Sequence, residues 1–315
     1  MSDDHSSASP HPTPELWLNT SRQLRRHWMP EKANLALEQA LTAQPQILQS
    51  AQFRGAHPAD QANQRTPQPF IAVSCEKCGS HLLSDMLQAL TGLAFHWPDD
   101  TTLQPLQNDP YFTRPEGSFL IGHFPAHPEW TARLTAANVR VVMLYRDPRD
   151  ALVSFYHHYI DVNCWGDQGN LLGRFLASLP KSEALNLMIT GYTPTAERSE
   201  TWTGLPSRQW HWVRNWIGSG LPYLALRYED VITDKAGALQ QLGDFLGYAL
   251  NPEQRQTIVA QTAFEQSSAT MTRNNLPASF KRKGRAGDWR NHFSPSNTRL
   301  FELVAGEQLR QLGYA

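Results

Sequence analysis

The sequence has few cysteines and no long apolar run. Its 315 residues include only three cysteines, at positions 75, 78 and 164. A small, odd number of cysteines does not fit the disulfide framework of a secreted small domain. No apolar run approaches the roughly 20 residues of a membrane-spanning helix. The first fourteen residues are polar and acidic, without the pattern of a signal peptide. We therefore expect a soluble, cytoplasmic protein with no membrane partner.

The chain also lacks a surplus of charge of either sign. Its 28 Lys and Arg nearly balance 29 Asp and Glu, for a formal net charge of −1. Without a positive surplus nothing in the composition indicates nucleic acid, and we expect no such partner. Any anion site must be local and built from a few clustered Arg and Lys. Hydrophobic residues make up 40% of the chain, which is enough for a large buried core.

Composition divides the chain into two parts. Residues 1–65 form an N-terminal extension whose start is rich in Ser, Pro and Asp, and we expect that start to be disordered. Apolar residues at helical spacing predict helices over 15–28 and 31–49, which would form a helical hairpin. The polar stretch 54–69 is typical of a linker. Residues 66–315 form the main domain.

Short apolar runs and helical patterns alternate along the main domain. Runs typical of buried strands occur at four places: 70–74, 119–122, 139–145 and 221–227. Helical patterns occupy 80–90, a stretch from 148, 208–219 and 235–247. This alternation predicts an α/β fold with a central, mostly parallel sheet flanked by helices. The segments 96–117 and 161–207 are long and irregular, so we expect lids or pocket-lining loops there.

The first candidate site is the loop 75–81, CEKCGSH, between the first strand and its helix. Such a loop can direct N–H groups and the positive end of a helix dipole at one phosphate. Its spacing is not that of a Walker A motif. Cys75 and Cys78 also form a C-x-x-C pair, which leaves a redox site open as an alternative. A zinc site would need further ligands, and we expect no metal.

The second candidate is the block 145–150, YRDPRD, at the end of a predicted buried strand. Arg146 lies where open α/β sheets bind ligands, and Ser154 follows two helical turns later. An ordinary helix start explains part of the block, with Asp147 as N-cap and a surface salt bridge from Arg149. It does not explain an arginine at the end of an apolar strand.

Histidines and a basic segment complete the set. His123 follows the second apolar run, although most of the twelve histidines must have structural roles. His157 and His158 are adjacent, so they point in different directions on a helix and are expected to be packing or surface residues. Near the C-terminus, residues 281–290, KRKGRAGDWR, cluster Arg and Lys on a Gly-containing backbone. That arrangement suits a multiply charged phosphate.

These segments together resemble the sulfotransferases that use 3'-phosphoadenosine 5'-phosphosulfate (PAPS). Residues 282–290 resemble the C-terminal family signature RKGxxGDWK, with Arg290 in place of the last Lys. The block 145–154 resembles the family's 3'-phosphate signature. Residues 122–125, GHFP, resemble its Thr-His-Leu-Pro segment. The loop 75–81 resembles the 5'-phosphosulfate loop PKSGTT.

The resemblance implies a P-loop NTPase-like sulfotransferase fold and a role for individual residues. Lys77 would be the catalytic lysine and His123 the catalytic base. The nucleotide would be held by residues from several segments: Lys77, Cys78, Gly79, Ser80, His81, Leu82, Arg146, Ser154, Trp210, Thr262, Phe264, Arg282, Lys283 and Gly284. The segment 228–230, YED, also matches the family, and we expect its role to be structural.

Four positions depart from the family pattern. In the 75–81 loop, Glu76, Cys78 and His81 replace Pro, Ser and the second Thr, and Ile121 stands where the family has a Lys. Two alternatives therefore stay open. One is a catalytically impaired module that binds PAPS or its product 3',5'-ADP (PAP), and the other is a P-loop-type nucleotide kinase.

The resemblance further implies sulfuryl transfer from PAPS to a hydroxyl or an amine of a small organic acceptor, giving a sulfate ester and PAP. No metal is required for this reaction, because fixed cations neutralise the charge. Aromatic residues suggest apolar walls for the acceptor: Trp97, Phe112, Phe124 and Trp165. A homodimer is compatible with the sequence but not indicated, because no segment clearly matches the family's short C-terminal dimer motif.

Overall fold

The computed structural model describes the main domain with a few gaps. The described residues are 67–97, 111–161, 173–192, 202–203, 205–264 and 283–314. The predicted N-terminal extension over residues 1–65 lies outside them, as do Cys164, Trp165 and Arg282.

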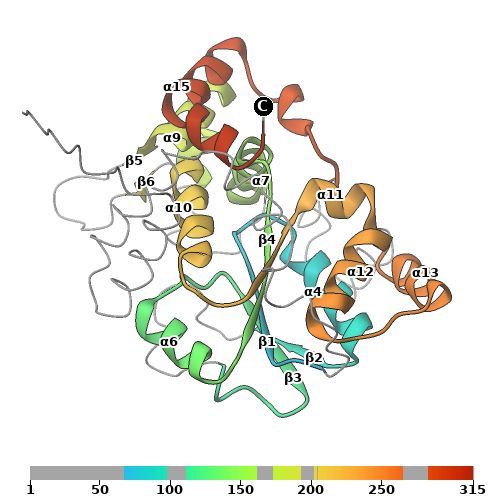
Figure 1. Cartoon of the computed structure of the whole chain (residues 1–315). Coiled ribbons are helices and arrows are strands. Elements are labelled where there is room, and N and C mark those ends of the chain that lie inside the picture. Colours follow the sequence, from blue (N-terminus) through green and yellow to red (C-terminus); the bar gives the residue numbers. More distant parts are fainter. Residues whose placement is uncertain are drawn as a thin grey trace, which may run out of the picture.

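A five-stranded parallel sheet forms the centre of the fold (Figure 1). Its strands are β1 (Phe70–Ser74), β2 (Ala94–His96), β3 (Ser118–Gly122), β4 (Arg140–Tyr145) and β7 (Tyr223–Arg227). The spatial order is β2-β3-β1-β4-β7, and each neighbouring pair is parallel. A separate antiparallel pair joins β5 (Gly191–Tyr192) to β6 (Trp202–Thr203). The predicted parallel sheet is thus confirmed, with β2 as an unpredicted edge strand.

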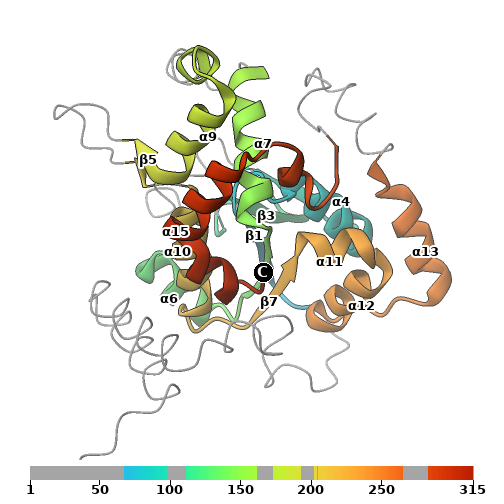
Figure 2. The same cartoon turned by 90° about the horizontal axis from the view of Figure 1, so that it is seen from above.

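Side-chain alternation along the strands creates two cores, one on each face of the sheet. On one face, Ile71 and Val73 pack among residues from five helices, α6 (Pro128–Ala136), α7 (Pro148–Asp161), α9 (Lys181–Thr190), α10 (Leu205–Ile217) and α15 (Pro295–Gln311). On the other face, Ala72 and Val142 pack among α4 (Ser80–Thr91), α11 (Tyr228–Thr233), α12 (Lys235–Leu246) and α13 (Pro252–Gln261). Figures 1 and 2 show these two helical layers on opposite sides of the sheet. Because both faces are covered, the central strands are apolar throughout.

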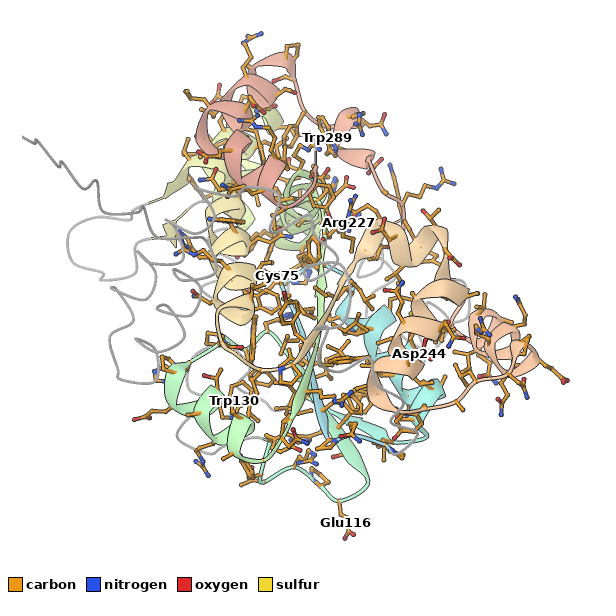
Figure 3. All side chains as sticks on the ribbon, in the orientation of Figure 1. Cys75, Glu116, Trp130, Arg227, Asp244 and Trp289 are labelled. Carbon is orange, nitrogen blue, oxygen red and sulfur yellow. The ribbon has the colours of Figure 1, made fainter. Side chains whose placement is uncertain are left out.

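The strand order brings three carboxyl ends together. The central strand β1 lies between β3 and β4, so the segments that follow these three strands are neighbours. The chain leaves β1 toward β2 on one side and later reaches β4 on the other. Open α/β sheets bind ligands where the strand order reverses in this way. In Figure 3, Cys75 marks this carboxyl edge and Glu116 the opposite edge of the sheet.

Local signals set the start of two further helices. Asn251 before α13 and Ser294 before α15 each form a capping box with the third residue of the helix, and a proline follows each cap. A short 3₁₀ helix, η4 (Asp288–Asn291), precedes α15. None of the helices in the described part of the chain has the length and apolar character that a bilayer span needs.

The expectation of an irregular segment over 161–207 is wrong in part. Helix α9 lies within it and buries Ala184, Leu185 and Ile189 in the first core. These positions repeat with the spacing of one helical face, which the polar residues around them obscured. The strand β6 and the start of α10 also fall in this segment. In the other segment, residues 98–110 lie outside the described residues.

Candidate functional site

The loop between β1 and α4 makes a sharp turn at the carboxyl edge. The Cys78 N–H donates to the Cys75 carbonyl oxygen at 3.2 Å, and Lys77 lies inside this turn with φ 61°. A left-handed lysine costs about 1–3 kcal/mol, and such residues cluster at functional sites. Gly79 has φ 101°, and a Cβ there would lie 2.7 Å from the Tyr228 ring. Only glycine therefore fits at the point where the loop enters α4.

The amino end of α4 suits an anion. Its N-cap is Gly79, which has no side chain to bond the N–H groups of the first turn, and that turn contains no acidic residue. Ser80, His81 and Leu82 form this turn and are half-buried. The predicted residues of this loop are thus placed around one helix N-terminus, on a segment next to β3 and β4.

The two cysteines of the loop are buried packing residues. Cys75 is 6% exposed and Cys78 is fully buried. They pack with Ala151 of α7 and against Trp212 of α10. Among the described residues, no group of three or more His, Cys, Asp or Glu could hold a metal ion.

His123 follows β3 and lies against the end of β1. Its Nδ1 is 2.9 Å from the Ser74 carbonyl oxygen and 3.5 Å from the Ser74 hydroxyl. A carbonyl oxygen can only accept, so Nδ1 carries a proton and Nε2 is the acceptor nitrogen of the neutral ring. The Trp97 ring contacts His123 edge-on, with centroids 5.1 Å apart. This is the tautomer that a base acting through Nε2 requires.

The backbone beside His123 is also fixed. The ring of Phe124 lies over Gly122, where a Cβ would come within 2.7 Å of it. The Phe124 carbonyl oxygen accepts hydrogen bonds from the indole N–H groups of Trp212 and Trp216, each at 2.9 Å. Neither tryptophan was predicted as part of the site.

Arg146 connects the other motifs. Its Nη2 donates to the Arg285 carbonyl oxygen at 2.8 Å, and its Nη1 lies 3.5 Å from the Lys77 carbonyl oxygen. The guanidinium stacks on the Tyr228 ring, 4.5 Å from its centroid. The buried Nε has no hydrogen-bond partner among the described residues. Leaving a buried donor unsatisfied costs about 1–3 kcal/mol, so the arrangement fits a bound anion that would accept from Arg146.

The start of α7 matches the predicted helix cap but not the predicted surface ion pair. The Asp147 carboxylate accepts from the Arg149 N–H at 2.9 Å, as an N-cap does. The Arg149 guanidinium pairs with Asp147 at 2.8 Å, but its side chain is only 10% exposed. It also stacks 4.2 Å from the centroid of the Trp289 ring. The expectation of a surface salt bridge is wrong because a segment 140 residues away covers this helix start.

Asp150 ties that distant segment to α7. Its Oδ2 accepts from the Gly287 N–H at 2.6 Å, and its Oδ1 accepts from the Trp289 N–H at 2.8 Å. The Nη2 of Arg146 lies 3.7 Å from the same carboxylate oxygen, Oδ2. Burial raises the pKa of the Asp150 carboxyl, and the nearby Arg146 charge counteracts this in part. One carboxylate thus joins the strand-end arginine to the C-terminal basic segment.

Gly284 of that segment lies against Phe264, and both were predicted to bind the nucleotide. Gly284 has φ 62°, and a Cβ there would lie 2.5 Å from the Phe264 ring. Lys283, which was also predicted, forms an ion pair with Asp288 at 3.0 Å. Arg282, predicted beside them, lies outside the described residues. We call residues 283–290 the basic loop.

The segment 228–230 supports this arrangement from below. Besides the contacts of Tyr228, the half-buried Glu229 accepts from the Asp147 N–H at 3.0 Å and from the Tyr314 hydroxyl at 2.7 Å. Burial raises the pKa of the Glu229 carboxyl. The contacts are those of a structural support for the β4–α7 connection.

Three other predicted residues lie in mixed surroundings. Ser154 is half-buried on α7. Thr262 follows α13 and is 3% exposed, and its hydroxyl donates to the Ile258 carbonyl oxygen at 2.8 Å. Trp210 is 6% exposed and belongs to the core on the α10 side of the sheet. Packing thus takes up most of the surface of Thr262 and Trp210.

Two of the aromatic residues expected to line an acceptor pocket differ in their exposure. Phe124 is fully buried against Trp130, with centroids 5.3 Å apart, so it does not form the wall of an open pocket. Phe112 is 46% exposed, and the Arg133 guanidinium of α6 lies 5.1 Å from its ring centroid. For Phe124, aromatic character alone did not distinguish a core position from a pocket wall.

Comparisons with known proteins identify the family of this chain. The sulfotransferase domain family model matches residues 67–313. Sulfotransferase 6B1 of Pan troglodytes is 24% identical over 254 residues, covering 76% of this chain and 77% of that protein. Sulfotransferase 2A6 of Rattus norvegicus is 28% identical over 207 residues, covering 60% of this chain and 63% of that protein.

Solved structures show the same fold. Mouse sulfotransferase SULT7A1 complexed with PAP superposes with a TM-score of 0.59 at 19% identity, covering 77% of this chain and 85% of that one. Retinol dehydratase in a complex with retinol and PAP gives a TM-score of 0.52 at 20% identity, covering 80% and 85%. The family model covers most of the described domain, and the parallel sheet flanked by helices is the fold of these structures. The chain therefore belongs to the PAPS-dependent sulfotransferase family.

Proposed function

We propose that this protein transfers the sulfuryl group of PAPS to a hydroxyl or an amine of a small organic acceptor through His123, Lys77 and Arg146. The observation that carries the proposal is the hydrogen bond from His123 Nδ1 to the Ser74 carbonyl oxygen. It holds a base-competent ring beside the strand end from which the Lys77 loop begins. PAPS supplies the activated sulfuryl group when bound.

His123 acts as the general base. Its Nε2 takes the proton from the acceptor hydroxyl or amine as that group attacks sulfur. The ring then carries a positive charge, and its Nδ1–H remains directed at the Ser74 carbonyl oxygen. The carbonyl dipole stabilises that charge and keeps the ring from turning, as an orienting carboxylate does in other enzymes.

Lys77 stabilises the charge that develops on the departing phosphate oxygen. Transfer of this type is helped mainly by positioning and by fixed positive groups. The strained backbone of Lys77 and the glycine at position 79 bring the loop close to the amino end of α4. The N–H groups of that helix turn add partial positive charge at the same point.

Arg146 and the basic loop hold the 3'-phosphate. The unsatisfied Nε of Arg146 would donate to a phosphate oxygen, while the other guanidinium nitrogens stay bonded to protein carbonyls. Ser154 and the N–H of Gly284 would donate from either side. Such a clamp selects PAPS over ATP, because ATP has no 3'-phosphate.

We propose a small acceptor with an aromatic or apolar body. The Trp97 ring against His123 offers an apolar contact where the acceptor hydroxyl must lie. The retinol dehydratase complex contains retinol, a molecule of this kind. The near-zero net charge supports a small-molecule partner rather than nucleic acid, and the small number of cysteines supports a cytoplasmic location.

A two-part assay tests the proposal. Radiolabelled PAPS is incubated with the protein and a library of phenols, alcohols and amines, and 3',5'-ADP binding is measured by calorimetry. We expect a labelled product and binding of 3',5'-ADP without Mg²⁺. Binding without transfer to any acceptor would favour a catalytically impaired module. Tighter binding of ATP-Mg²⁺ than of PAPS would overturn the proposal in favour of a kinase.

A further inference from the structure

Trp212 of α10 lies between the segment after β3 and a small buried cluster. Its indole Nε1 donates to the Phe124 carbonyl oxygen at 2.9 Å, in the segment after β3. Its half-buried ring packs against the cluster formed by Cys75 and Cys78 of the loop after β1 and Ala151 of α7. A rigid side chain placed between that segment and this cluster can fix the position of one relative to the other.

The Phe124 carbonyl oxygen is an anchor with two donors. Trp216, one helical turn after Trp212, also donates to it at 2.9 Å. A carbonyl oxygen has two lone pairs, so both bonds can be made at once. Trp216 is 1% exposed and belongs to the core, and the half-buried Trp212 packs against that core as well. Of the two indoles, Trp212 also packs against the cluster of Cys75, Cys78 and Ala151.

These contacts close a ring around the catalytic base. His123 precedes Phe124 in the chain, and its imidazole is bonded to the Ser74 carbonyl oxygen. Ser74 is followed by Cys75, whose side chain lies in the cluster packed against Trp212. The base is thus held through its ring on one side and through its backbone on the other, and Trp212 joins the two sides.

We infer that Trp212 is a positioning residue, which sets the place of His123 Nε2 relative to Lys77 without touching the reacting atoms. The inference rests on the proposed role of His123 as base and adds a residue that determines its geometry. A displacement of the base lowers the rate of the chemical step more than it lowers binding, because reaction requires close alignment of the reacting atoms.

Two substitutions separate the hydrogen bond from the packing. In histidine, Nε2 occupies the ring position that Nε1 has in tryptophan, so Trp212→His keeps a donor for the Phe124 carbonyl oxygen. It loses the six-membered ring and with it part of the packing against the cluster of Cys75, Cys78 and Ala151. Trp212→Phe keeps a six-membered ring and loses the donor. Exposed His211, the preceding residue on α10, gives a matched control as His211→Gln.

Steady-state kinetics with PAPS and the best acceptor of the library give the test. We expect Trp212→Phe to lower kcat by about three- to tenfold, the value of one neutral hydrogen bond, with KM for PAPS unchanged. Trp212→His should restore kcat toward the wild-type value, and His211→Gln should not change it. An unchanged kcat in Trp212→Phe would overturn the inference. So would equal losses of kcat in the Phe and His variants, which would indicate packing alone.

A parallel His123→Asn variant distinguishes failure of the positioning inference from failure of the proposed function. If His123→Asn is inactive while Trp212→Phe has the wild-type kcat, only the positioning inference is wrong. If His123→Asn itself turns over at the wild-type rate, the assignment of the base is wrong, and the role of Trp212 is refuted with it.

Discussion

Replacing Asp150 with Asn tests whether one carboxylate holds the basic loop in place. The carboxylate accepts from the N–H groups of Gly287 and Trp289 and faces Arg146. An amide of the same shape has one oxygen, so it can accept from one N–H and directs its own NH₂ at the other. The Asp150→Asn variant would also lack the negative charge that faces the guanidinium.

The expected loss follows from the burial of this side chain. A hydrogen bond to a charged group contributes about 1.5–3 kcal/mol, and at 1% exposure water does not replace it. Burial raises the pKa of Asp150, so desolvation already offsets part of that gain, and we expect a loss near the lower bound. A loss of about 1.5–2 kcal/mol corresponds to an affinity for 3',5'-ADP that is about ten- to thirtyfold lower.

Calorimetry with two nucleotides provides the assay. The affinity for 3',5'-ADP should fall in Asp150→Asn, whereas that for 5'-ADP, which has no 3'-phosphate, should stay nearly constant. The exposed Asp244 on α12, labelled in Figure 3, gives the control Asp244→Asn. Equal losses for both nucleotides, or a wild-type affinity for 3',5'-ADP, would refute the role of Asp150 as the tie between α7 and the 3'-phosphate clamp.

Three other substitutions have defined outcomes. Gly284→Ala places a Cβ on a residue with φ 62° and against the Phe264 ring. Calorimetry should therefore show 3',5'-ADP binding weakened by at least about 1–2 kcal/mol. A wild-type affinity would contradict the contact. Burial lowers the pKa of His158 to about 4, below its unfolded value near 6.5. Because the folded protein favours the neutral ring, the free energy of unfolding should fall by about 3 kcal/mol as pH falls from 6.5 to 4. Urea unfolding of His158→Phe should show a weaker dependence on pH in that window, and an unchanged dependence would exclude this source. Tyr314→Phe removes the hydroxyl bonded to Glu229 and should lower the free energy of unfolding by about 1.5–3 kcal/mol, a loss that urea unfolding would detect or exclude.

The sheet was largely predictable because its central strands are buried on both faces. Continuous apolar runs marked β1, β3, β4 and β7, and the helices after them followed the helical period. The edge strand β2 has only three residues, with Ala94 and Phe95 exposed, so it carries no such signal. Its pairing with β3 is a consequence of the tertiary fold.

The motifs of the site were predictable for a related reason. Lys77, His123 and Arg146 each follow a recognisable strand, and the ends of neighbouring parallel strands meet at one edge of the sheet. What the sequence could not indicate is which distant side chains join them. The hydrogen bonds of Asp150 to the basic loop and of Trp212 to the His123 segment span 137 and 88 residues.

The position of Asp150 did contain a partial signal. It lies four residues after Arg146, a spacing that brings opposite charges together on a helix. Nothing local indicated the backbone of Gly287 as a further partner. Arg149 illustrates the same difficulty, because the residues that bury it come from the other end of the chain.

Turnover by His123→Asn tests the central claim most directly. Transfer of radiolabelled sulfuryl from PAPS to the best acceptor is measured for the wild type, for His123→Asn and for the control His211→Asn, together with 3',5'-ADP affinity. We predict that His123→Asn loses about 10²–10⁴ in rate, while its nucleotide affinity and the control stay close to wild type. A His123→Asn protein that binds 3',5'-ADP normally and transfers sulfuryl at the wild-type rate would contradict the account.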